Sequence, residues 1–551
     1  GQYGKAYEIN LRDNVFPGIL GRVCSRPCED SCRHGWEGNG EPVAICFSKR
    51  SSADLETRPP VVLPPMFPDS GKTVAVIGAG VAGLAAARDL ALFGHRVTVF
   101  ERHKTPGGML NQGIPVFRLP RELIEREIGQ VQAVGVEIRC GVDIGKDVAV
   151  AQLMATYDAV VMAAGTLRPN LLDLPGHDLA GIEHGLKYLL EVNEFGRREV
   201  GNKATIIGGG YTAMDCSRTS LRLGAEVGVY YRRAREDMVI LPGEVEELCH
   251  ESGLMENNCS PVAFLGNNGC VTGVRYIRTG RGEPGTDGRR KWIDIPGSEF
   301  EVEADTVILA TGQFPQTHWI DKALSADLVG PDEWLLCGKS YHTKHAKLFV
   351  AGDFALGATT LIQAIGHARR CAREVDTQLM GEKRVKRVAH IGPAFYSKGK
   401  GAQTTGRTSD MNYIPLHVMP TLEPEKRDFS AEVELGYPEP QAKGEASRCY
   451  LCHYKFEIID TKCILCDECL LVKPVPDCIM EIAALLRDEQ GVITGYQPIV
   501  KDKTDSLYYS RLWIDQSKCI RCGQCEAVCP VNAISIQKVS LEEQVCAQHG
   551  G

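Results

Sequence analysis

The sequence lacks any long hydrophobic run, and it lacks a surplus of basic charge. No stretch reaches the roughly 18 consecutive apolar residues that a membrane helix needs, so we expect a soluble protein. The 62 lysine and arginine residues are outnumbered by 70 aspartate and glutamate residues, which gives a net charge of −8. This balance provides no general attraction to nucleic acid or to an anionic membrane, so neither partner is expected.

Cysteine, in contrast, is abundant. Of the 22 cysteines, twelve fall in two dense blocks near the chain ends. In a long chain without a signal peptide, clustered C-x2-C spacing favours reduced thiolates that bind iron or zinc, so we expect a cytoplasmic protein. The 551 residues leave room for three or four domains. Because the first residue is Gly and the chain begins as if inside a helix, we expect that some N-terminal sequence is missing.

Between the two blocks, short apolar runs such as TVAVIG, RVTVF and KATIIGGG alternate with helical stretches, which predicts an α/β fold with buried parallel strands. One run continues into Gly78-x-Gly80-x-x-Gly83 and a helix, and Glu101 follows 23 residues after Gly78. The glycines allow pyrophosphate to sit at the helix end, and the acid can accept hydrogen bonds from an adenosine ribose. This segment therefore predicts a dinucleotide site, with a merely tight turn as the alternative.

A second copy of the motif, GGGYTAMD, contains Gly208, Gly210, Tyr211, Thr212 and Ala213. No acid follows at the matching distance, and Arg232 and Arg233 stand there instead. Guanidinium groups suit a 2′-phosphate that a carboxylate would repel, so NADPH is favoured over NADH. The alternative is a solvated arginine pair in a site that takes NADH.

A third segment, LFVAGDFALGATTLIQAIGHARR, follows the second motif. Its strand ends at Gly352 and Asp353, and Thr359 and Thr360 precede a helix whose amides could face a flavin ring. The FAD domain is therefore predicted in two halves, with the nicotinamide domain inserted between them. This arrangement is typical of flavoproteins that have two dinucleotide-binding domains.

The cysteine block near the C-terminus is the most specific signal in the chain. Two C-x2-C-x2-C runs, the second continuing as x3-C-P, reproduce the two-cluster ferredoxin pattern, in which the fourth cysteine of each run binds the other cluster. The predicted ligands are Cys463, Cys466, Cys469 and Cys529 for one 4Fe-4S cluster, and Cys519, Cys522, Cys525 and Cys478 for the other. Two structural zinc sites are the alternative.

The front block contains Cys24, Cys28 and Cys32, and Cys46 follows 14 residues later. Four soft ligands in this short segment could hold a third 4Fe-4S cluster, with a zinc site or plain buried thiols as alternatives.

A separate pair, Cys449-x-x-Cys452 followed by His453, matches both a c-type haem attachment and a redox dithiol. A haem conflicts with a cytoplasmic flavoprotein. A structural or unassigned pair, or a dithiol near the flavin, is therefore favoured.

Several segments, among them GRVCSRPCEDSC, EPVAI, GGMLNQGIPVFRLPRELIEREI, YYRRAREDM and ATGQFP, resemble the small subunit of NADPH-dependent glutamate synthase over residues 1–385. The resemblance implies FAD in the first site, a nicotinamide cofactor in the second, and electrons that leave through the N-terminal cluster region. It also implies that Gly108, Met109 and Arg118 lie near FAD. The family's Glu or Gln ligand aligns with Lys49, so Cys46 is taken as its replacement, and a further N-terminal cysteine set is absent here.

The C-terminal cysteine block is not found in that subunit. The whole layout resembles the DsrL family of iron–sulfur flavoproteins of dissimilatory sulfur metabolism, which link NAD(P)H to dissimilatory sulfite reductase. The predicted segments are an N-terminal helical iron–sulfur domain (1–66), the first half of the FAD-binding domain (67–168), an NAD(P)H-binding domain (169–313), the second half of the FAD-binding domain (314–384), a connector (385–448) and a two-cluster ferredoxin-like α+β domain (449–551).

We predict an NAD(P)H:acceptor oxidoreductase that passes electrons between a nicotinamide cofactor, FAD and three 4Fe-4S clusters. The expected acceptor is a protein that docks near the C-terminal clusters, such as dissimilatory sulfite reductase or a ferredoxin-like carrier, and a homodimer is among the expected assemblies. The cofactors carry the chemistry, so no catalytic acid or base is predicted. A flavin-dependent disulfide reductase that uses Cys449 and Cys452, and a non-catalytic electron-relay subunit, are the alternatives.

Overall fold

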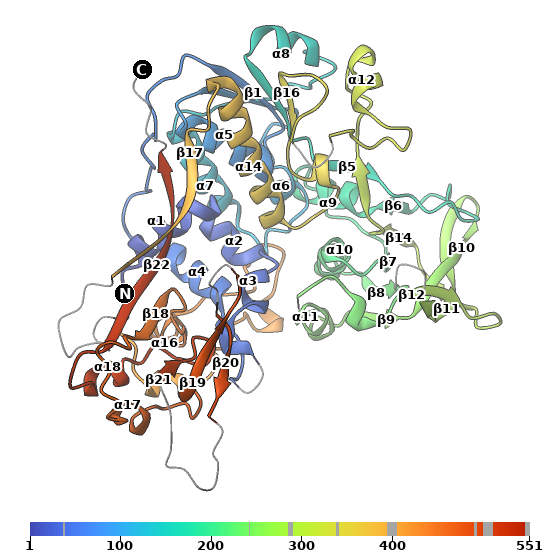
Figure 1. The fold of residues 1–551 in the computed structure, drawn as a ribbon. Helices are drawn as coiled ribbons and strands as arrows, with labels where there is room; N and C mark the ends of the chain where they lie inside the picture. Colours follow the sequence, from blue (N-terminus) through green and yellow to red (C-terminus); the bar gives the residue numbers. More distant parts are fainter. Residues whose placement is uncertain are drawn as a thin grey trace.

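The computed structural model describes residues 1–36, 39–241, 243–284, 290–337, 341–393, 405–489, 493–499 and 511–545. Figure 1 shows an α/β body above a smaller domain that contains the C-terminal cysteines, with the N-terminal helices between them. Within the described parts of the chain, no helix combines the length and the apolar character that a membrane crossing requires.

The N-terminal segment is helical. Its helices are α1 (Tyr3–Asn14), α2 (Pro17–Val23), α3 (Pro27–Asp30) and α4 (Ile45–Asp54). The buried carboxylate of Glu127, on α7 (Arg121–Ala133), accepts hydrogen bonds from the amides of Gly18 (2.7 Å) and Ile19 (3.0 Å). A carboxylate at this end of a helix offsets the positive end of its dipole. Glu127 therefore fixes the N-terminal helices to the α/β body.

The first nucleotide-binding domain contains a five-stranded parallel sheet in the order β16, β4, β1, β2, β3. The strands are β1 (Thr73–Ile77), β2 (Arg96–Glu101), β3 (Glu137–Cys140), β4 (Ala159–Met162) and β16 (Leu348–Val350). Helices α5 (Val81–Leu92) and α14 (Leu361–Met380) pack together beside it (Figure 1). Because β16 follows the second domain in the chain and pairs with β4, the predicted split fold is confirmed.

The second nucleotide-binding domain has its own parallel sheet in the order β6, β14, β7, β8, β9, with an antiparallel extension. Its elements are β6 (Ile182–His184), α9 (Gly185–Asn193), β7 (Lys203–Ile207), α10 (Tyr211–Arg222), β8 (Glu226–Tyr231), α11 (Glu244–His250), β9 (Leu254–Asn257), β10 (Cys259–Asn267), β11 (Cys270–Pro284), β12 (Arg290–Asp294), β13 (Phe300–Glu303) and β14 (Thr306–Leu309). The two chain segments that connect the domains are the strands β5 (Thr166–Pro169) and β15 (Gln313–Pro315), which pair with each other. The domain boundaries expected at 168 and 313 fall in this pair.

The C-terminal domain contains two three-stranded antiparallel sheets, β17–β22–β18 and β20–β19–β21. Its elements are β18 (Tyr454–Ile458), α17 (Glu468–Leu471), β19 (Ile479–Arg487), β20 (Ile493–Pro498), β21 (Arg511–Ile514), α18 (Gln524–Val528) and β22 (Ile534–Val545). Each short helix contains the third cysteine of a run, Cys469 on α17 and Cys525 on α18, so each cysteine loop lies between a strand and a helix.

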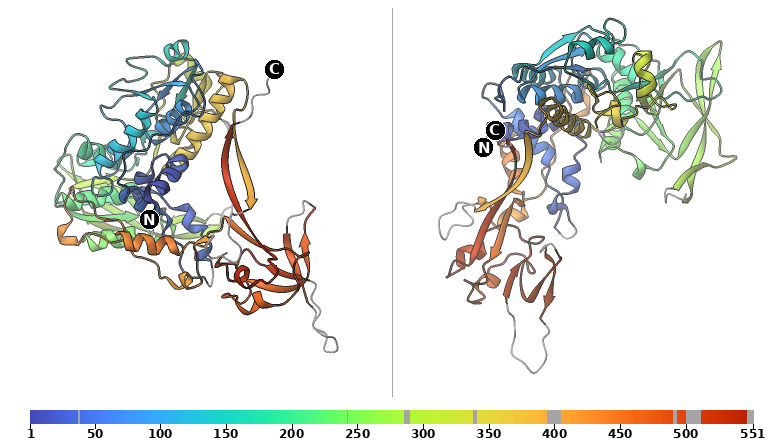
Figure 2. Two further views of the ribbon diagram at one scale, coloured as in Figure 1. Left: turned by 90° about the vertical axis from the view of Figure 1, so that its left-hand side faces the viewer. Right: turned by 45° about the horizontal axis from the view of Figure 1, so that its top comes forward.

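A segment of the predicted connector is a strand. Residues Val385–Pro393 form β17, which pairs with β22 along its whole length, from Val385 opposite Val545 to Pro393 opposite Gln537. Figure 2 shows the two as a long ribbon between the α/β body and the C-terminal domain. The connector interpretation missed β17 because VKRVAHIGP alternates only weakly and its partner lies about 150 residues later in the chain. Residues 405–448 form only short helices such as α16 (Glu439–Ser447), and residues 394–404 lie outside the described parts.

Candidate functional site

The first glycine-rich turn joins β1 to α5, and its backbone requires glycine at two positions. Gly78 has φ +102°, and a Cβ there would lie 2.6 Å from the carbonyl oxygen of Ala163. A Cβ on Gly83 would lie 1.9 Å from the carbonyl oxygen of Gly78. Gly80, in contrast, has open space at its Cβ position and lines the adjoining pocket. A phosphate is able to approach the backbone through that space.

Glu101 ends β2 and is 6% exposed. Its carboxylate accepts hydrogen bonds from the amides of Ala79 (2.8 Å) and His103 (2.9 Å), so it joins the glycine turn to the end of β2. The side chain also lines the pocket, where its remaining lone pairs are able to accept hydrogen bonds from ribose hydroxyl groups.

The pocket beside this turn extends between the first domain and the two connecting strands, β5 and β15. Of the residues expected to bind FAD, six line it: Gly78, Gly80, Glu101, Gly108, Met109 and Asp353. Gln313 and Trp319 also line it, and the sequence interpretation missed both. Trp319 stacks on Phe354 at 5.6 Å and reaches the pocket only because β16 and the segment before it fold back onto the first sheet. No local motif marks such a residue.

The second half of the FAD domain contributes the opposite wall. Thr359 donates a hydrogen bond to the carboxylate of Asp353 (2.5 Å), and burial raises the pKa of Asp353 while this bond lowers it. Thr360 caps α14, whose first turn brings Leu361 and Ala364 to the pocket. The positive end of this helix dipole therefore lies at the pocket wall, where it favours negative charge on a bound ring. Gly352, with φ +66°, makes the turn from β16 into this segment.

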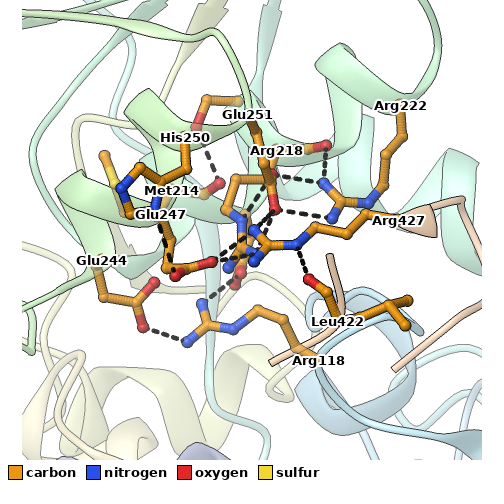
Figure 3. Close-up of polar contacts among 12 residues, drawn as sticks. Arg118, Met214, Arg218, Arg222, Glu244, Glu247, His250, Glu251, Leu422 and Arg427 are labelled. Carbon is orange, nitrogen blue, oxygen red and sulfur yellow. Dashed lines mark hydrogen bonds and ion pairs between the residues drawn. The ribbon is translucent and has the colours of Figure 1, made fainter. Parts of the chain in front are cut away.

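Arg118 does not line this pocket, although the resemblance implied a place near FAD. Its guanidinium contacts Asp215 of α10 at 2.6 Å and Glu244 of α11 at 2.5 Å (Figure 3). It also lies 5.9 Å from the centre of the Tyr211 ring. Two carboxylates of the second domain therefore hold the side chain at the boundary between the two nucleotide-binding domains.

Next to this contact, Glu251 binds three arginines in a nearly buried cluster (Figure 3). Arg218 and Arg222 of α10 each approach its carboxylate to 2.7 Å, and Arg427 of the connector approaches to 3.0 Å. Burial raises the pKa of Glu251, but hydrogen bonds from Arg222 and Arg218 outweigh burial and lower it to about 2. The cluster attaches the connector to the second nucleotide-binding domain.

Replacing Glu251 with glutamine is expected to lower the free energy of unfolding by about 3–5 kcal/mol at neutral pH, because three buried guanidinium groups lose their counter-charge. The carboxyl pKa is about 2 in the folded chain, against about 4.3 when unfolded. The ion-pair contribution is therefore complete above about pH 4.3 and is lost as the pH falls towards about 2. Urea unfolding of both proteins across this range measures the difference.

Glu246→Gln, on the helix that ends just before Glu251, is the control for that prediction. Glu246 pairs with Arg235 at the surface, so its loss should change stability by less than about 1 kcal/mol. If the difference in free energy of unfolding between the wild type and Glu251→Gln stays constant down to about pH 2, the charge state assigned to Glu251 is wrong.

The second glycine-rich turn joins β7 to α10. Gly208 has φ +149°, and a Cβ there would lie 2.3 Å from the carbonyl oxygen of Ala310. Gly210 has open space at its Cβ position, as Gly80 does. Tyr211 and Thr212 form the first turn of α10, where backbone amides are able to bind pyrophosphate.

Two arginines follow β8 near this turn. Arg232 is exposed and Arg233 is half-buried, and within the described residues neither forms an ion pair with a carboxylate. The nearby Arg235 and Arg281, in contrast, pair with Glu246 and Glu236. Arg232 and Arg233 thus retain guanidinium charge that a 2′-phosphate could neutralise.

The C-terminal domain gathers the eight cysteines into the two predicted sets. Cys463, Cys466, Cys469 and Cys529 line one small cavity, although Cys529 belongs to the later run. In the other set, burial raises the pKa of Cys478 to about 11, and the neighbouring Cys519 and Cys522 thiols raise it further. Cys525 has Cys519, Cys522 and Cys478 among its neighbours, and burial raises its pKa strongly.

Each of these two sets provides four thiol groups, the number of ligands that a 4Fe-4S cluster takes. Among the described residues, no group of three or more Cys, His, Asp or Glu side chains is arranged to hold one metal ion. In a 4Fe-4S cluster each thiolate binds a different iron atom, so its four ligands stand further apart than those of one zinc ion.

The front cysteines are divided in the structure. Cys24 and Cys46 are 4% and 1% exposed and pack in the core of the first domain. The Cys46 thiol donates hydrogen bonds to the carbonyl oxygens of Leu20 (3.3 Å) and Gly21 (3.4 Å). Cys28 is exposed and Cys32 is half-buried.

Comparison with known proteins agrees with this architecture. Residues 72–372, more than half of the chain, match the pyridine nucleotide-disulphide oxidoreductase family, and residues 512–535 match the 4Fe-4S binding domain. The chain is 34% identical over 482 residues to the NADP(+)-dependent formate dehydrogenase subunit beta of Moorella thermoacetica, covering 82% of this chain and 67% of that protein. It is 33% identical over 482 residues to the NADPH-Fe(3+) oxidoreductase subunit beta of Geobacter sulfurreducens, covering 80% and 70%.

The expected resemblance is also found. The glutamate synthase (NADPH) small chain of Escherichia coli K12 is 32% identical over 395 residues, covering 68% of this chain and 82% of that protein. The resemblance inferred from sequence segments is therefore confirmed.

Proposed function

This chain belongs to the pyridine nucleotide-disulphide oxidoreductase family, and we propose that it passes electrons between NADPH, FAD and 4Fe-4S clusters to a protein partner. It is an NADPH-dependent oxidoreductase with flavin and iron–sulfur domains. The observation that carries the proposal is one chain with two glycine-rich dinucleotide turns and eight cysteines in two ferredoxin-type sets.

The residues have distinct roles in this proposal. When bound, FAD accepts an electron pair from the nicotinamide and the clusters carry electrons singly. Glu101 and the Gly78 turn hold the adenosine and pyrophosphate, while Asp353 and the start of α14 form the wall at the ring. Gly208 and the start of α10 receive the nicotinamide nucleotide. A third cluster is proposed at a site that includes Cys32 of the front block.

The proposed acceptor is a protein that docks at the C-terminal clusters. Ile464 lines the Cys463 cavity and is 60% exposed, and Leu471, at the end of α17, is 78% exposed. Apolar side chains of this size suit a protein contact. Two relatives are named as beta subunits, which supports a larger assembly. The candidate acceptors are those that the sequence predicted, dissimilatory sulfite reductase or a ferredoxin-like carrier.

Anaerobic titration of the purified holoprotein with NADPH tests the proposal. The flavin absorbance should bleach first, and electron paramagnetic resonance signals of reduced clusters should follow. A flavin spectrum that responds to neither NADPH nor NADH would refute the proposed electron path.

Replacing both Arg232 and Arg233 with alanine is expected to lower kcat/KM for NADPH about 10- to 100-fold, because charge-assisted hydrogen bonds are worth about 1.5–3 kcal/mol. The value for NADH should change little, because NADH has no 2′-phosphate. Arg235→Ala, which breaks only a surface pair with Glu246, is the control. Equal losses with both nucleotides, or none, would mean that the two arginines do not select the cofactor.

A further inference from the structure

The Cys449-x-x-Cys452 segment folds like the cluster loops of the C-terminal domain. Leu451, the residue before Cys452, has φ +51°. The matching residues of the two ferredoxin-type loops, Leu465 and Arg521, have φ +54° and +59°. Non-glycine residues rarely adopt this conformation, which turns successive amides towards one side and creates the concave nests found at iron–sulfur sites.

A hydrogen bond to sulfur accompanies this turn. The amide of Leu451 donates to the Cys449 sulfur at 3.5 Å. In the front block, the amide of Arg26 donates to the Cys24 sulfur at 3.4 Å in the same way. Such bonds stabilise a thiolate and are found around cluster sulfurs. A plain surface dithiol does not require this arrangement.

The front segment that carries Cys32 lies directly against this loop. Arg33 donates to the Cys452 sulfur at 3.6 Å and to the Cys519 carbonyl oxygen at 3.4 Å, and the His34 ring lies 4.7 Å from the Tyr450 ring. The Cys452 and Cys32 thiols are among the charged neighbours of the Cys449 thiol. Cys32 therefore lies near the Cys449–Cys452 pair.

Three arginines surround this group without a carboxylate to balance them. Arg407 and Arg521 are 1% and 3% exposed, and Arg33 is half-buried. They donate to carbonyl oxygens, such as those of Ile520 (2.8 Å) and Tyr454 (3.1 Å), and within the described parts of the chain none of them forms an ion pair with Asp or Glu. Buried guanidinium groups this close together need an anion, and a thiolate-bound cluster is one.

The Cys28 thiol belongs with the front block instead, because the Cys24 thiol is among its neighbours. Cys32 lies beyond the end of α3 in extended backbone, so the two cysteines do not share a helix face. Cys28 is exposed, whereas Cys24 and Cys46 are enclosed in the apolar core.

We propose that Cys32, Cys449 and Cys452 together bind a 4Fe-4S cluster where the N-terminal helices meet the C-terminal domain. This site rests on the proposed function, and it replaces the expected set of Cys24, Cys28, Cys32 and Cys46. It brings the start of the C-terminal domain into the electron path, and Arg33 links the site directly to the Cys519 loop.

Iron analysis of the anaerobically purified full chain tests this site. Three clusters correspond to about 12 iron atoms per chain. Cys32→Ser and Cys449→Ser/Cys452→Ser should each lose about four iron atoms and keep FAD. Cys46→Ser, whose hydroxyl can still donate to Leu20, should lose none. Loss of iron from Cys46→Ser with none lost from the double variant would restore the front set and overturn the proposal.

Alkylation of the wild-type chain gives a second test that needs no variant. Iodoacetamide should leave Cys32, Cys449 and Cys452 unmodified in the native protein and label all three after iron chelation. Labelling of Cys449 and Cys452 before chelation would identify a free dithiol and refute the site. Bleaching of the flavin by NADPH, measured on the same sample, separates this outcome from failure of the proposed function.

Discussion

A Gly83→Ala variant is expected to be purified without FAD. The added Cβ would lie 1.9 Å from the Gly78 carbonyl oxygen, and neither backbone can move without opening the turn between β1 and α5. Overpacking of this kind costs about 1–3 kcal/mol or more. If the FAD-bound turn bears that cost, the affinity for FAD falls about 10- to 100-fold or more. Flavin absorbance per chain after gel filtration measures the loss.

Gly80→Ala separates the effect on the cofactor from the effect on the protein. Gly80 has φ −75° and no protein atom within 4 Å of its Cβ position, so alanine fits the fold. The same Cβ projects where the pocket receives the pyrophosphate. The Gly80→Ala apoprotein should therefore have the melting temperature of the wild-type apoprotein, but its affinity for FAD should be reduced. Gly83→Ala should lower both the melting temperature and the affinity for FAD.

Gly129→Ala is the matched control, because Gly129 lies within α7 with nothing near its Cβ position. Alanine is favoured there by up to about 1 kcal/mol, and FAD should be retained. Wild-type FAD affinity in Gly80→Ala would show that the cofactor does not approach this turn.

The elements that the sequence predicted well depend on short-range pattern. Gly78, Gly83 and Glu101 lie within one strand–helix–strand unit, so their spacing alone indicates the turn and its acid. The crossed pairing of Cys529 with the earlier cysteine run follows from a repeat in which each ligand has a fixed place. The spacing does not show whether the third motif position requires glycine. Ala213 occupies that position in the second domain, whereas in the first domain the contact with Gly78 excludes a side chain at Gly83.

The elements that it missed depend on contacts between distant segments. Arg118 is held by Asp215 and Glu244, which lie about 100 residues later and meet it only when the two domains pack. Cys32 was grouped with its neighbours in the chain, whereas the folded chain brings it to Cys449. Spacing motifs contain no information about which surfaces meet.

Replacing Cys466 with alanine is expected to stop electron delivery to a protein acceptor while leaving reduction of the flavin intact. Cys466 lines the cavity with Cys463, Cys469 and Cys529, and it is itself exposed, so this cluster would be the outermost carrier. Its loss removes about four iron atoms per chain and the last step of the path. The NADPH-dependent bleaching of the flavin lies upstream and should keep its wild-type rate.

Reduction of an added 4Fe-4S ferredoxin by NADPH, followed anaerobically, measures the effect, and the rate should fall to the background without enzyme. Cys249→Ser is the control, because Cys249 is an exposed cysteine on α11, outside all the proposed sites. If Cys466→Ala loses its cluster and still reduces ferredoxin at the wild-type rate, electrons leave from another carrier. The docking surface then lies elsewhere than at Ile464 and Leu471, because a partner bound there would be separated from the remaining clusters by the empty site.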